Sequence, residues 1–330
     1  MPEKRGGRKH LIVCSPELVP ALKTVLEEHT AGDPMKPECL WTNLSMQAIS
    51  RLMSVAGFHA SPYIVEQLLA ECKLGHRQAF KYLTMRQHKD RNQQFGILGA
   101  YKQSFLESLN PIISIDTKKK EVLGLFYRKG RLFTAEGREV FDHDFASFGK
   151  GVVIPHGIYD LKRNRGYVNL GTSHDTSAFA CDSVFQWWTA EGHDTYPHAT
   201  ELLLLCDGGG SNSASQYLFK DDLQQLADRM GITIRVAHYP PYCSKYNPIE
   251  HRLFPHVTRA CQGIILECVE QAQYYMSKAA TQTGLKVVVN ILDKVYETGR
   301  KVAEGFKKTM KIVFDEVLPK FNYTAIPVSV

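Results

Sequence analysis

Three acidic residues stand at positions where their carboxylates can act together. Asp116 and Asp207 each end a short apolar run, and Glu250 opens a predicted helix. Converging carboxylates without His or Cys partners suit a hard cation with oxygen ligands, and Mg²⁺ leaves coordination positions open for water and a phosphate oxygen. The residue types therefore predict a site for two Mg²⁺ ions, replaceable by Mn²⁺, held by Asp116, Asp207 and Glu250.

The chemistry expected of such a site is phosphodiester cleavage. Two divalent cations roughly 3.5–4 Å apart can activate an attacking oxygen and stabilise the departing one in an in-line displacement. The protein then needs no covalent nucleophile. A single acid at a strand end is more often a turn or cap residue, whereas three acids at matching positions favour catalysis.

Residues beside the three acids are candidates for orienting the carboxylates or binding phosphates. They are Lys118, Lys119, Lys120, Gly208, Gly209, Gly210, Asn212, Lys245, His251 and Arg252. The glycines permit close approach of a nucleic-acid backbone, or form a tight turn. The three consecutive lysines either position phosphates or form an exposed β-turn. His251 and Arg252 are predicted to orient Glu250 or contact a phosphate, and a metal-ligand role for His251 is less favoured.

The elements that must position these residues follow a recognisable order. Apolar runs predict strands at 111–115, 122–127 and 167–170, a helix at 177–189, a strand at 202–206, a helix at 215–230, a strand at 232–237 and a helix from 248. This is the order of the ribonuclease-H-like fold, a mixed α/β sheet flanked by helices. In that fold the first and fourth strands are neighbours, so Asp116 and Asp207 should project at the same edge and Glu250 should close the site from its helix.

Upstream, residues 45–74 predict a small all-α region with a helix, a turn and a second helix. Ser45 is a candidate N-cap, Gly57 ends the first helix, and Ser61 with Pro62 starts the second. The spacing is typical of a DNA-binding helix-turn-helix. A purely structural helical hairpin is an equal alternative, because the exposed face of the second helix carries two acids that phosphates would repel.

A basic stretch follows the predicted helix pair. Its cations are Lys73, Arg77, Lys81, Arg86, Lys89 and Arg91. Asp90 is the one acid among them, so the stretch is either a DNA-phosphate-contacting linker or a solvated helix face. The predicted organisation is an N-terminal segment at 1–44, a helix-turn-helix with basic linker at 45–92, and a ribonuclease-H-like catalytic domain at 93–330.

Composition is compatible with a nucleic-acid partner without requiring one. The chain has 330 residues and a formal net charge of +6 at pH 7. No apolar stretch approaches the roughly 18 residues that read as a membrane span, and the first ten residues have no signal-peptide character. The eight cysteines include no C-x-x-C pair. These features predict a cytoplasmic protein without membrane contact, with reduced thiols, and associated with the nucleoid when bound to DNA.

Several long motifs resemble the Rhodopirellula-type DDE transposases, a group of bacterial insertion-sequence enzymes. The motifs are IDTKKKE from Ile115, GIYDL from Gly157, SHDTSAFA from Ser173, CDGGGSN from Cys206 and SKYNPIEHRLF from Ser244. The likeness covers roughly residues 111–323, with weaker matches at HKDRNQQF and WTNLS upstream. It implies that Asp116, Asp207 and Glu250 correspond to the Asp-Asp-Glu triad of the family's ribonuclease-H-like domain.

The resemblance also implies a function. Water would cleave a DNA strand, and the freed 3′-hydroxyl would attack target DNA, in a homo-oligomer that binds the terminal repeats of an element. Family members have a longer region before a GGRK motif, found here at Gly6, which predicts a shortened copy or a distinct start. Two alternatives remain open: a ribonuclease-H-fold nuclease or resolvase without strand transfer, and a non-catalytic transposase-derived DNA-binding protein. The presence of all three acids favours an enzyme.

Overall fold

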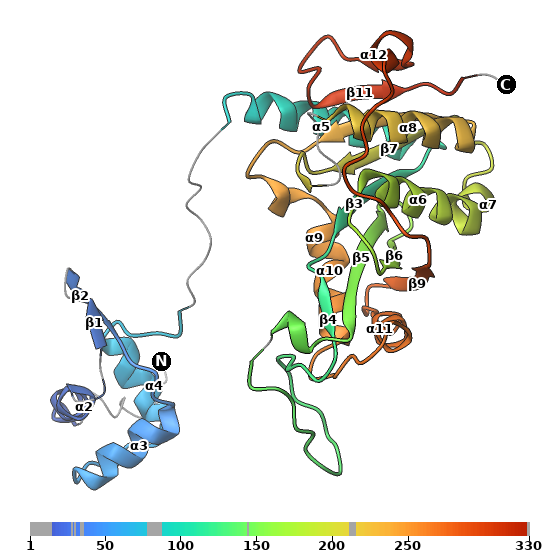
Figure 1. The fold of residues 1–330 in the computed structure, drawn as a ribbon. Coiled ribbons are helices and arrows are strands. Elements are labelled where there is room, and N and C mark those ends of the chain that lie inside the picture. Colours follow the sequence, from blue (N-terminus) through green and yellow to red (C-terminus); the bar gives the residue numbers. More distant parts are fainter. Residues whose placement is uncertain are drawn as a thin grey trace, which may run out of the picture. The chain divides into compact units, whose positions relative to one another are not determined.

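The computed structural model describes residues 15–27, 29, 31–33, 36–77, 88–143, 145–210 and 216–328. The chain forms two compact units, Met1–Leu83 and Thr84–Val330. Figure 1 traces both units along the chain. Among the described residues, no helix combines the length and the apolar character needed to cross a membrane.

The first unit contains three helices and a hairpin. Its elements are α2 (Leu18–Glu27), β1 (Ala31–Asp33), β2 (Lys36–Trp41), α3 (Met46–Val55) and α4 (Pro62–Glu71). The two predicted helices and their caps are confirmed, since the side chain of Ser45 accepts a hydrogen bond from the backbone of α3 and that of Ser61 from the backbone of α4. Leu22 of α2 is buried with residues of α3 and α4. The first compact unit therefore includes α2 as well as the predicted helix pair.

The second unit is built on one mixed sheet. Its strands are β3 (Ile112–Thr117), β4 (Glu121–Leu123), β5 (Gly151–Asp160), β6 (Arg165–Gly171), β7 (Glu201–Cys206), β8 (Thr233–His238), β9 (Lys286–Leu292), β10 (Ile312–Phe314) and β11 (Asn322–Ala325). The strand order is β10-β11-β8-β7-β3-β5-β6-β9, with β4 paired to β5. β3, β7 and β8 are parallel, and β5 is antiparallel to both β3 and β6. The central order β6-β5-β3-β7-β8 confirms the ribonuclease-H-like fold class.

The second long strand of this sheet is not where the sequence pattern placed it. Residues 122–127 were expected to form it, but β4 ends at Leu123, before Gly124, whose φ of +137° breaks the extended run. The strand is β5, whose sequence contains Pro155 and two glycines and so reads as a poor central strand. Proline is tolerated there because β3 pairs with β5 only as far as His156.

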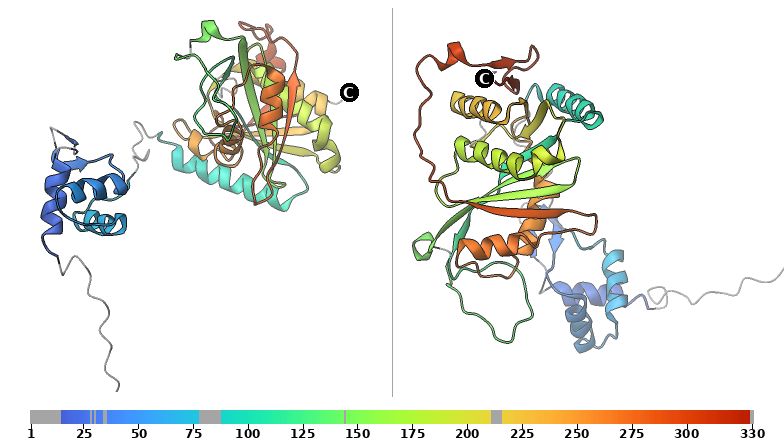
Figure 2. Two further views of the ribbon diagram at one scale, coloured as in Figure 1. Left: turned by 90° about the horizontal axis from the view of Figure 1, so that it is seen from below. Right: turned by 90° about the vertical axis from the view of Figure 1, so that its right-hand side faces the viewer.

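Helices cover both faces of the sheet (Figures 1 and 2). They are α5 (Arg91–Glu107), α6 (Ser177–Trp187), α7 (His193–Thr195), α8 (Tyr217–Met230), α9 (Ile249–Arg252), α10 (Phe254–Ala260), α11 (Val269–Met276) and α12 (Phe306–Thr309). α6 and α8 pack with Ile113 and Ile115 on one face. α5 packs with Ile112 and Leu205 on the other face, and α9 to α11 cover β5, β6 and β9. Trp187 and Trp188 are buried in the first of these cores, as expected for structural residues.

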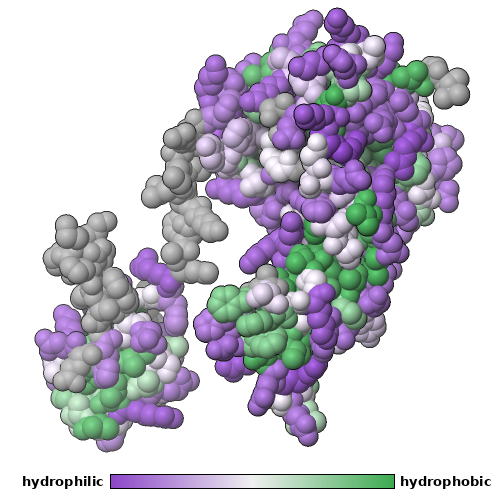
Figure 3. Space-filling view, in the orientation of Figure 1, coloured by the Kyte–Doolittle hydropathy of each residue, from purple (hydrophilic) through white to green (hydrophobic). Residues whose placement is uncertain are grey.

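The connection between β4 and β5 extends away from the sheet. It includes the short helix η1 (Ala146–Phe148) and carries the exposed rings of Phe133, Phe141, Phe145 and Phe148. Figure 3 shows an apolar area over the segment around η1. These rings therefore lie outside the core that supports the sheet.

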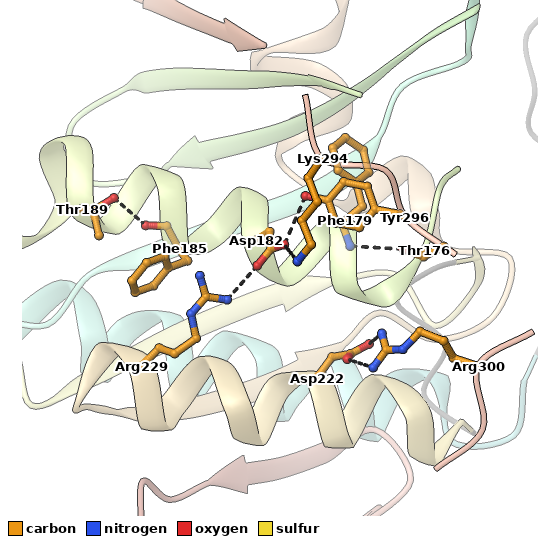
Figure 4. Close-up of polar contacts among 10 residues, drawn as sticks. All are labelled: Thr176, Phe179, Asp182, Phe185, Thr189, Asp222, Arg229, Lys294, Tyr296 and Arg300. Atoms are coloured by element: carbon orange, nitrogen blue, oxygen red, sulfur yellow. Dashed lines mark hydrogen bonds and ion pairs between the residues drawn. The ribbon is translucent and has the colours of Figure 1, made fainter. Parts of the chain in front are cut away.

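The segment after β9 is fastened to α6 and α8 by ion pairs (Figure 4). Asp182 of α6 is bonded to Arg229 of α8 at 2.7 Å and to Lys294 at 2.7 Å. Arg300 contacts the buried carboxylate of Asp222 on α8 at 2.8 Å. These contacts guide the chain across the helix layer towards β10 and β11, which extend the sheet beyond β8.

Candidate active site

The sheet brings Asp116 and Asp207 together. β3 and β7 are adjacent and parallel, with Ser114 opposite Leu205. Asp116 lies two residues further along β3, and Asp207 directly follows the last residue of β7; neighbouring strands lie about 4.8 Å apart. Because side chains alternate between faces, both aspartates project to the same face as Ser114 and Leu205. Register therefore places the two residues side by side at the same edge of the sheet.

Glu250 reaches the same place because α9 is anchored to β3. The hydroxyl of Ser114 accepts a hydrogen bond from the backbone N–H of Ile249 at 3.1 Å and donates one to the side-chain oxygen of Asn247 at 2.5 Å. The amide nitrogen of Asn247 donates to the backbone oxygen of Ile115 at 3.2 Å. Ser114 and Asn247 are both fully buried. These contacts fix the start of α9 beside the end of β3, where Asp116 lies.

The carboxylate of Asp116 has a strongly shifted protonation equilibrium. Burial raises its pKa to about 8, and the charges of Asp207 and Glu250 together with a hydrogen bond to Glu250 act in the same direction. The backbone N–H of Thr117, which donates to Asp116 at 2.8 Å, opposes this shift. The site thus disfavours simultaneous ionisation of the three neighbouring acids, and a bound cation would remove that penalty.

Asp207 lies in the same field, together with an acid that the sequence pattern did not single out. Burial raises the pKa of Asp207, as do the charges of Glu250 and Asp175, while a hydrogen bond from Gly209 lowers it. Asp175 accepts a hydrogen bond from the hydroxyl of Thr117 at 3.1 Å. The SHDTSAFA motif contains Asp175, and its position just before the N-terminus of α6 was the signal that could have identified it.

The donor atoms of this cluster fit Mg²⁺ or Mn²⁺ in chemistry, because they are carboxylate oxygens and include no thiolate or imidazole. The side chains are nevertheless not arranged around a single point. Within the described ranges, no group of three or more His, Cys, Asp and Glu side chains forms a ready-made metal site. The charges of Asp207 and Glu250 both raise the pKa of Asp116, and that of Glu250 also raises the pKa of Asp207, so the three carboxylates lie within electrostatic reach of one another.

A basic cavity of about 960 Å³ adjoins Glu250. Its lining includes all three predicted lysines, but they differ in environment. Lys118 is half-buried and paired with Glu121 at 2.5 Å, whereas Lys119 and Lys120 are exposed. Lys119 and Lys120 are thus free to meet phosphates, and Lys118 is committed to an internal ion pair.

The remaining residues proposed to flank the acids are mostly exposed. Gly208, Gly209 and Gly210 are open to solvent, and Gly210 has a φ of +57°. His251 and Arg252 are exposed on α9, and within the described parts of the chain neither side chain makes a hydrogen bond or ion pair. The ammonium group of Lys245 lies 5.2 Å from the ring of Tyr246, and Asn212 lies outside the described residues.

The basic stretch is divided between the two units. Lys73 and Arg77 are exposed in the first unit, and Lys89 is exposed in the second. Lys81 and Arg86 lie outside the described residues. The structure thus leaves the side chains of Lys73, Arg77 and Lys89 accessible to a polyanion.

Arg91 differs from the other cations of the stretch. It opens α5, and its guanidinium lies 5.0 Å from the ring of Phe95 and 5.6 Å from that of Tyr246. It also donates to the Tyr246 hydroxyl at 3.5 Å. Arg91 therefore helps to join α5 to the segment that precedes α9.

Known proteins were compared with the chain. The family model described as Rhodopirellula transposase DDE domain matches residues 21–327. No curated protein matches. Among solved structures, the chain is similar to the Mos1 transposase paired-end complex with left transposon end, at 14% sequence identity and a TM-score of 0.43. The matched region covers 83% of this chain and 73% of the Mos1 chain. The human cytomegalovirus terminase nuclease domain, soaked with Mn and inhibitor-bound, has 11% identity, coverages of 58% and 69%, and a TM-score of 0.23.

The family match includes β3, β7 and α9, and so contains all three acids of the site. It extends from within α2 to just beyond β11, and thus spans both compact units. The chain belongs to the family of the Rhodopirellula transposase DDE domain.

Proposed function

We propose that this chain is a DNA transposase that cleaves DNA and transfers the cut strand, with Asp116, Asp207 and Glu250 as ligands of two Mg²⁺ ions. The observation that supports this most strongly is the shared register position of Asp116 and Asp207, combined with the hydrogen bonds through Ser114 that hold the start of α9 beside the end of β3. When bound, Mg²⁺ would supply Lewis acidity for an in-line displacement at phosphorus, and Mn²⁺ would substitute for it.

The chain's own residues have separate tasks in this proposal. Lys119 and Lys120 contact phosphates of the incoming strand from the cavity beside Glu250. The exposed backbone at Gly208 and Gly209 lets that strand pass close to Asp207. Asp175 holds the hydroxyl of Thr117, next to Asp116, and so orients the end of β3. Binding and alignment of the phosphate are therefore the contribution of the protein itself.

Cleavage by variants of the three acids tests the proposal. Asp116→Asn, Asp207→Asn and Glu250→Gln keep side-chain size but remove a charge, and each is expected to reduce cleavage to background while DNA binding persists. Asp293→Asn, at an exposed acid after β9, is the matched control and should cleave as wild type. His251→Ala should show the milder loss of an orienting residue, about 10–100-fold. Full cleavage by any of the three acid variants contradicts the assignment.

Strand transfer is tested separately from cleavage. An oligonucleotide that already ends in the element's 3′-hydroxyl bypasses the first cut, so joining to a target duplex reports the second step alone. We expect joining in Mg²⁺ and Mn²⁺. Cleavage without joining would instead identify a nuclease or resolvase of the same fold.

The remaining parts of the proposal concern DNA binding and assembly. α3 and α4 are proposed to form a helix-turn-helix that recognises terminal repeats, and Lys73, Arg77 and Lys89 to contact phosphates. The acting species is proposed to be a homo-oligomer on paired element ends and target DNA, working at the bacterial nucleoid. The exposed positions of these three cations support the phosphate contacts.

A further inference from the structure

A second cavity, of about 410 Å³, also has Asp207 in its wall. Its lining residues come from three segments: Asp207, Gly208 and Gly209; Pro240, Pro241, Tyr242 and Ser244; and Lys320 and Phe321. The volume falls in the roughly 300–1,000 Å³ range of pockets that hold small organic groups. A group bound there would touch the loop that follows Asp207.

One wall of this cavity is a strained turn. The backbone N–H of Cys243 donates to the oxygen of Pro240 at 3.1 Å, which places Pro241 and Tyr242 at the centre of the turn. Tyr242 has a φ of +63°, a conformation that favours glycine or asparagine at this position. Its side chain is 60% exposed, so core packing does not explain why a tyrosine occupies it. Strain held at the surface beside a catalytic acid points to a role for the ring.

The facing wall is also built on a left-handed residue. Leu318 has a φ of +54°, and its carbonyl accepts a hydrogen bond from the N–H of Phe321 at 2.9 Å. The N–H of His238 donates to the carbonyl of Phe321 at 2.9 Å, which ties this wall to the end of β8, just before Pro240. Lys320 is exposed on this turn, while Phe321 is buried and gives the cavity an apolar surface.

The side chains of Tyr242 and Lys320 lie at the rim of the cavity. Within the described ranges, the hydroxyl of Tyr242 and the ammonium group of Lys320 have no hydrogen-bond or ion-pair partner. An accessible aromatic ring stacks on the face of a nucleobase, and a lysine pairs with phosphate. In a duplex, neighbouring bases cover these faces, so the ring selects an unpaired nucleotide.

We propose that this cavity holds one unpaired nucleotide of the DNA strand next to the cut, with its base on Tyr242 and its phosphate on Lys320. The inference rests on the proposed function, because Asp207 defines the position of the cut. It adds a substrate requirement: one nucleotide beside the reacting phosphate must leave its duplex.

The test uses the full chain and a duplex whose four-nucleotide single-stranded overhang carries 2-aminopurine, with Ca²⁺ present to avoid turnover. Fluorescence of 2-aminopurine reports stacking, and its titration gives the affinity. Tyr242→Gly suits the turn geometry, so its melting temperature should equal or exceed that of wild type, while its affinity for the overhang should fall about tenfold. Lys320→Gln should weaken binding several-fold.

Conservative variants and controls separate the role of each group. Tyr242→Phe and Lys320→Arg should keep both the fluorescence change and the affinity. Tyr274→Ala, which removes an equally exposed ring on α11, and Lys286→Gln, on β9, should behave as wild type. A blunt duplex should bind all of these proteins alike. Deoxyadenosine monophosphate should compete weakly, since a free nucleotide lacks the attached strand; strong competition would mean that the cavity binds free nucleotides.

The outcomes distinguish this inference from the proposed function. Overhang binding that is unchanged in Tyr242→Gly and Lys320→Gln, in a protein that cleaves DNA, overturns the nucleotide site alone. A protein that stacks 2-aminopurine through Tyr242 but does not cleave with Mg²⁺ overturns the proposed function and leaves the site intact. A wild-type chain that binds neither DNA overturns both.

Discussion

At the residue scale, the site depends on polar groups that are buried behind the acids. Ser114 bonds to both Asn247 and Ile249, and in this way connects β3 to α9. Loss of a buried hydrogen bond of this kind costs free energy, because the group left without a partner cannot bond to water instead. The position of Glu250 relative to Asp116 therefore depends on a residue that cannot itself contact substrate.

Ser114→Ala tests this dependence. We expect a loss of about 1–3 kcal/mol in the free energy of unfolding, because Ile249 and Asn247 each lose a partner. We also expect cleavage to fall about 10–100-fold at temperatures where the variant is fully folded. Ser183→Ala is the matched control, since the Ser183 hydroxyl is fully buried but has no hydrogen-bond partner among the described residues. Equal effects of the two substitutions on cleavage would refute a positioning role.

A second prediction at this scale concerns the effect of His156 on stability at low pH. The residue is fully buried in β5, and neither ring nitrogen has a hydrogen-bond partner in the described parts of the chain. Burial lowers its pKa from 6.5 to about 3. Below pH 6.5 the unfolded chain takes up a proton that the folded chain does not, so this residue makes stability fall by up to about 1.4 kcal/mol per pH unit, until the pH nears 3.

Replacement of this histidine should therefore remove part of the acid sensitivity. As the pH falls from 6.5 to 4.5, the free energy of unfolding of His156→Phe should rise relative to that of wild type. Above pH 7.5 the difference between the two proteins should stay constant. Denaturant unfolding at a series of pH values measures this. A pH profile of His156→Phe that runs parallel to that of wild type would contradict the account.

The residues of the site differ in how far the sequence could predict them. Asp116, Asp207 and Glu250 were identifiable because each marks the end or start of an apolar element. Ser114 and Asn247 were not, because their contact joins residues far apart in the chain: 133 positions separate Ser114 from Asn247. Periodicity reports which residues are buried, and does not report which distant polar groups meet.

At the element scale, most of the central sheet was predictable and its margins were not. β3, β6, β7 and β8 are apolar runs of ordinary character. β5 was missed because Pro155 and its glycines weaken the strand signal, although pairing with β3 and β6 stabilises it. β9, β10 and β11 join the sheet through long connections, and local patterns do not specify such pairings.

A prediction at the element scale concerns the ion pair that holds the connection after β9 to α8. Asp222→Asn removes the charge that holds Arg300 and also disturbs the buried contact with Ser177. We expect a loss of about 1–3 kcal/mol in stability and faster proteolysis within residues 293–311. Asp221→Asn, at the neighbouring position, alters a surface contact with Gln225 and removes a charge near Arg300, but keeps the ion pair with Asp222, so its effects on stability and proteolysis should be smaller. Intact resistance to protease in Asp222→Asn would show that this ion pair does not secure the connection.

At the scale of the whole molecule, charge should control the encounter with DNA. Neutralising Lys81, Arg86 and Lys89 together is expected to weaken binding about equally for all sequences. Each lost phosphate contact should flatten the slope of log K against log salt by about 0.9. Exchange of Lys23, Lys286 and Lys301 for glutamine removes the same charge elsewhere. This control should change the slope less than neutralising Lys81, Arg86 and Lys89 does. An unchanged slope in the first variant would assign the basic stretch to a solvated surface.

In the whole molecule, three acids from distant segments are proposed to form one metal site. Binding of Mn²⁺ to the full chain, followed by electron paramagnetic resonance and by competition with Mg²⁺, tests this without requiring activity. We expect wild type and Asp293→Asn to bind Mn²⁺ alike, and Asp116→Asn, Asp207→Asn and Glu250→Gln each to lose at least about tenfold in affinity. Wild-type affinity for Mn²⁺ in any of these three variants would contradict a shared site.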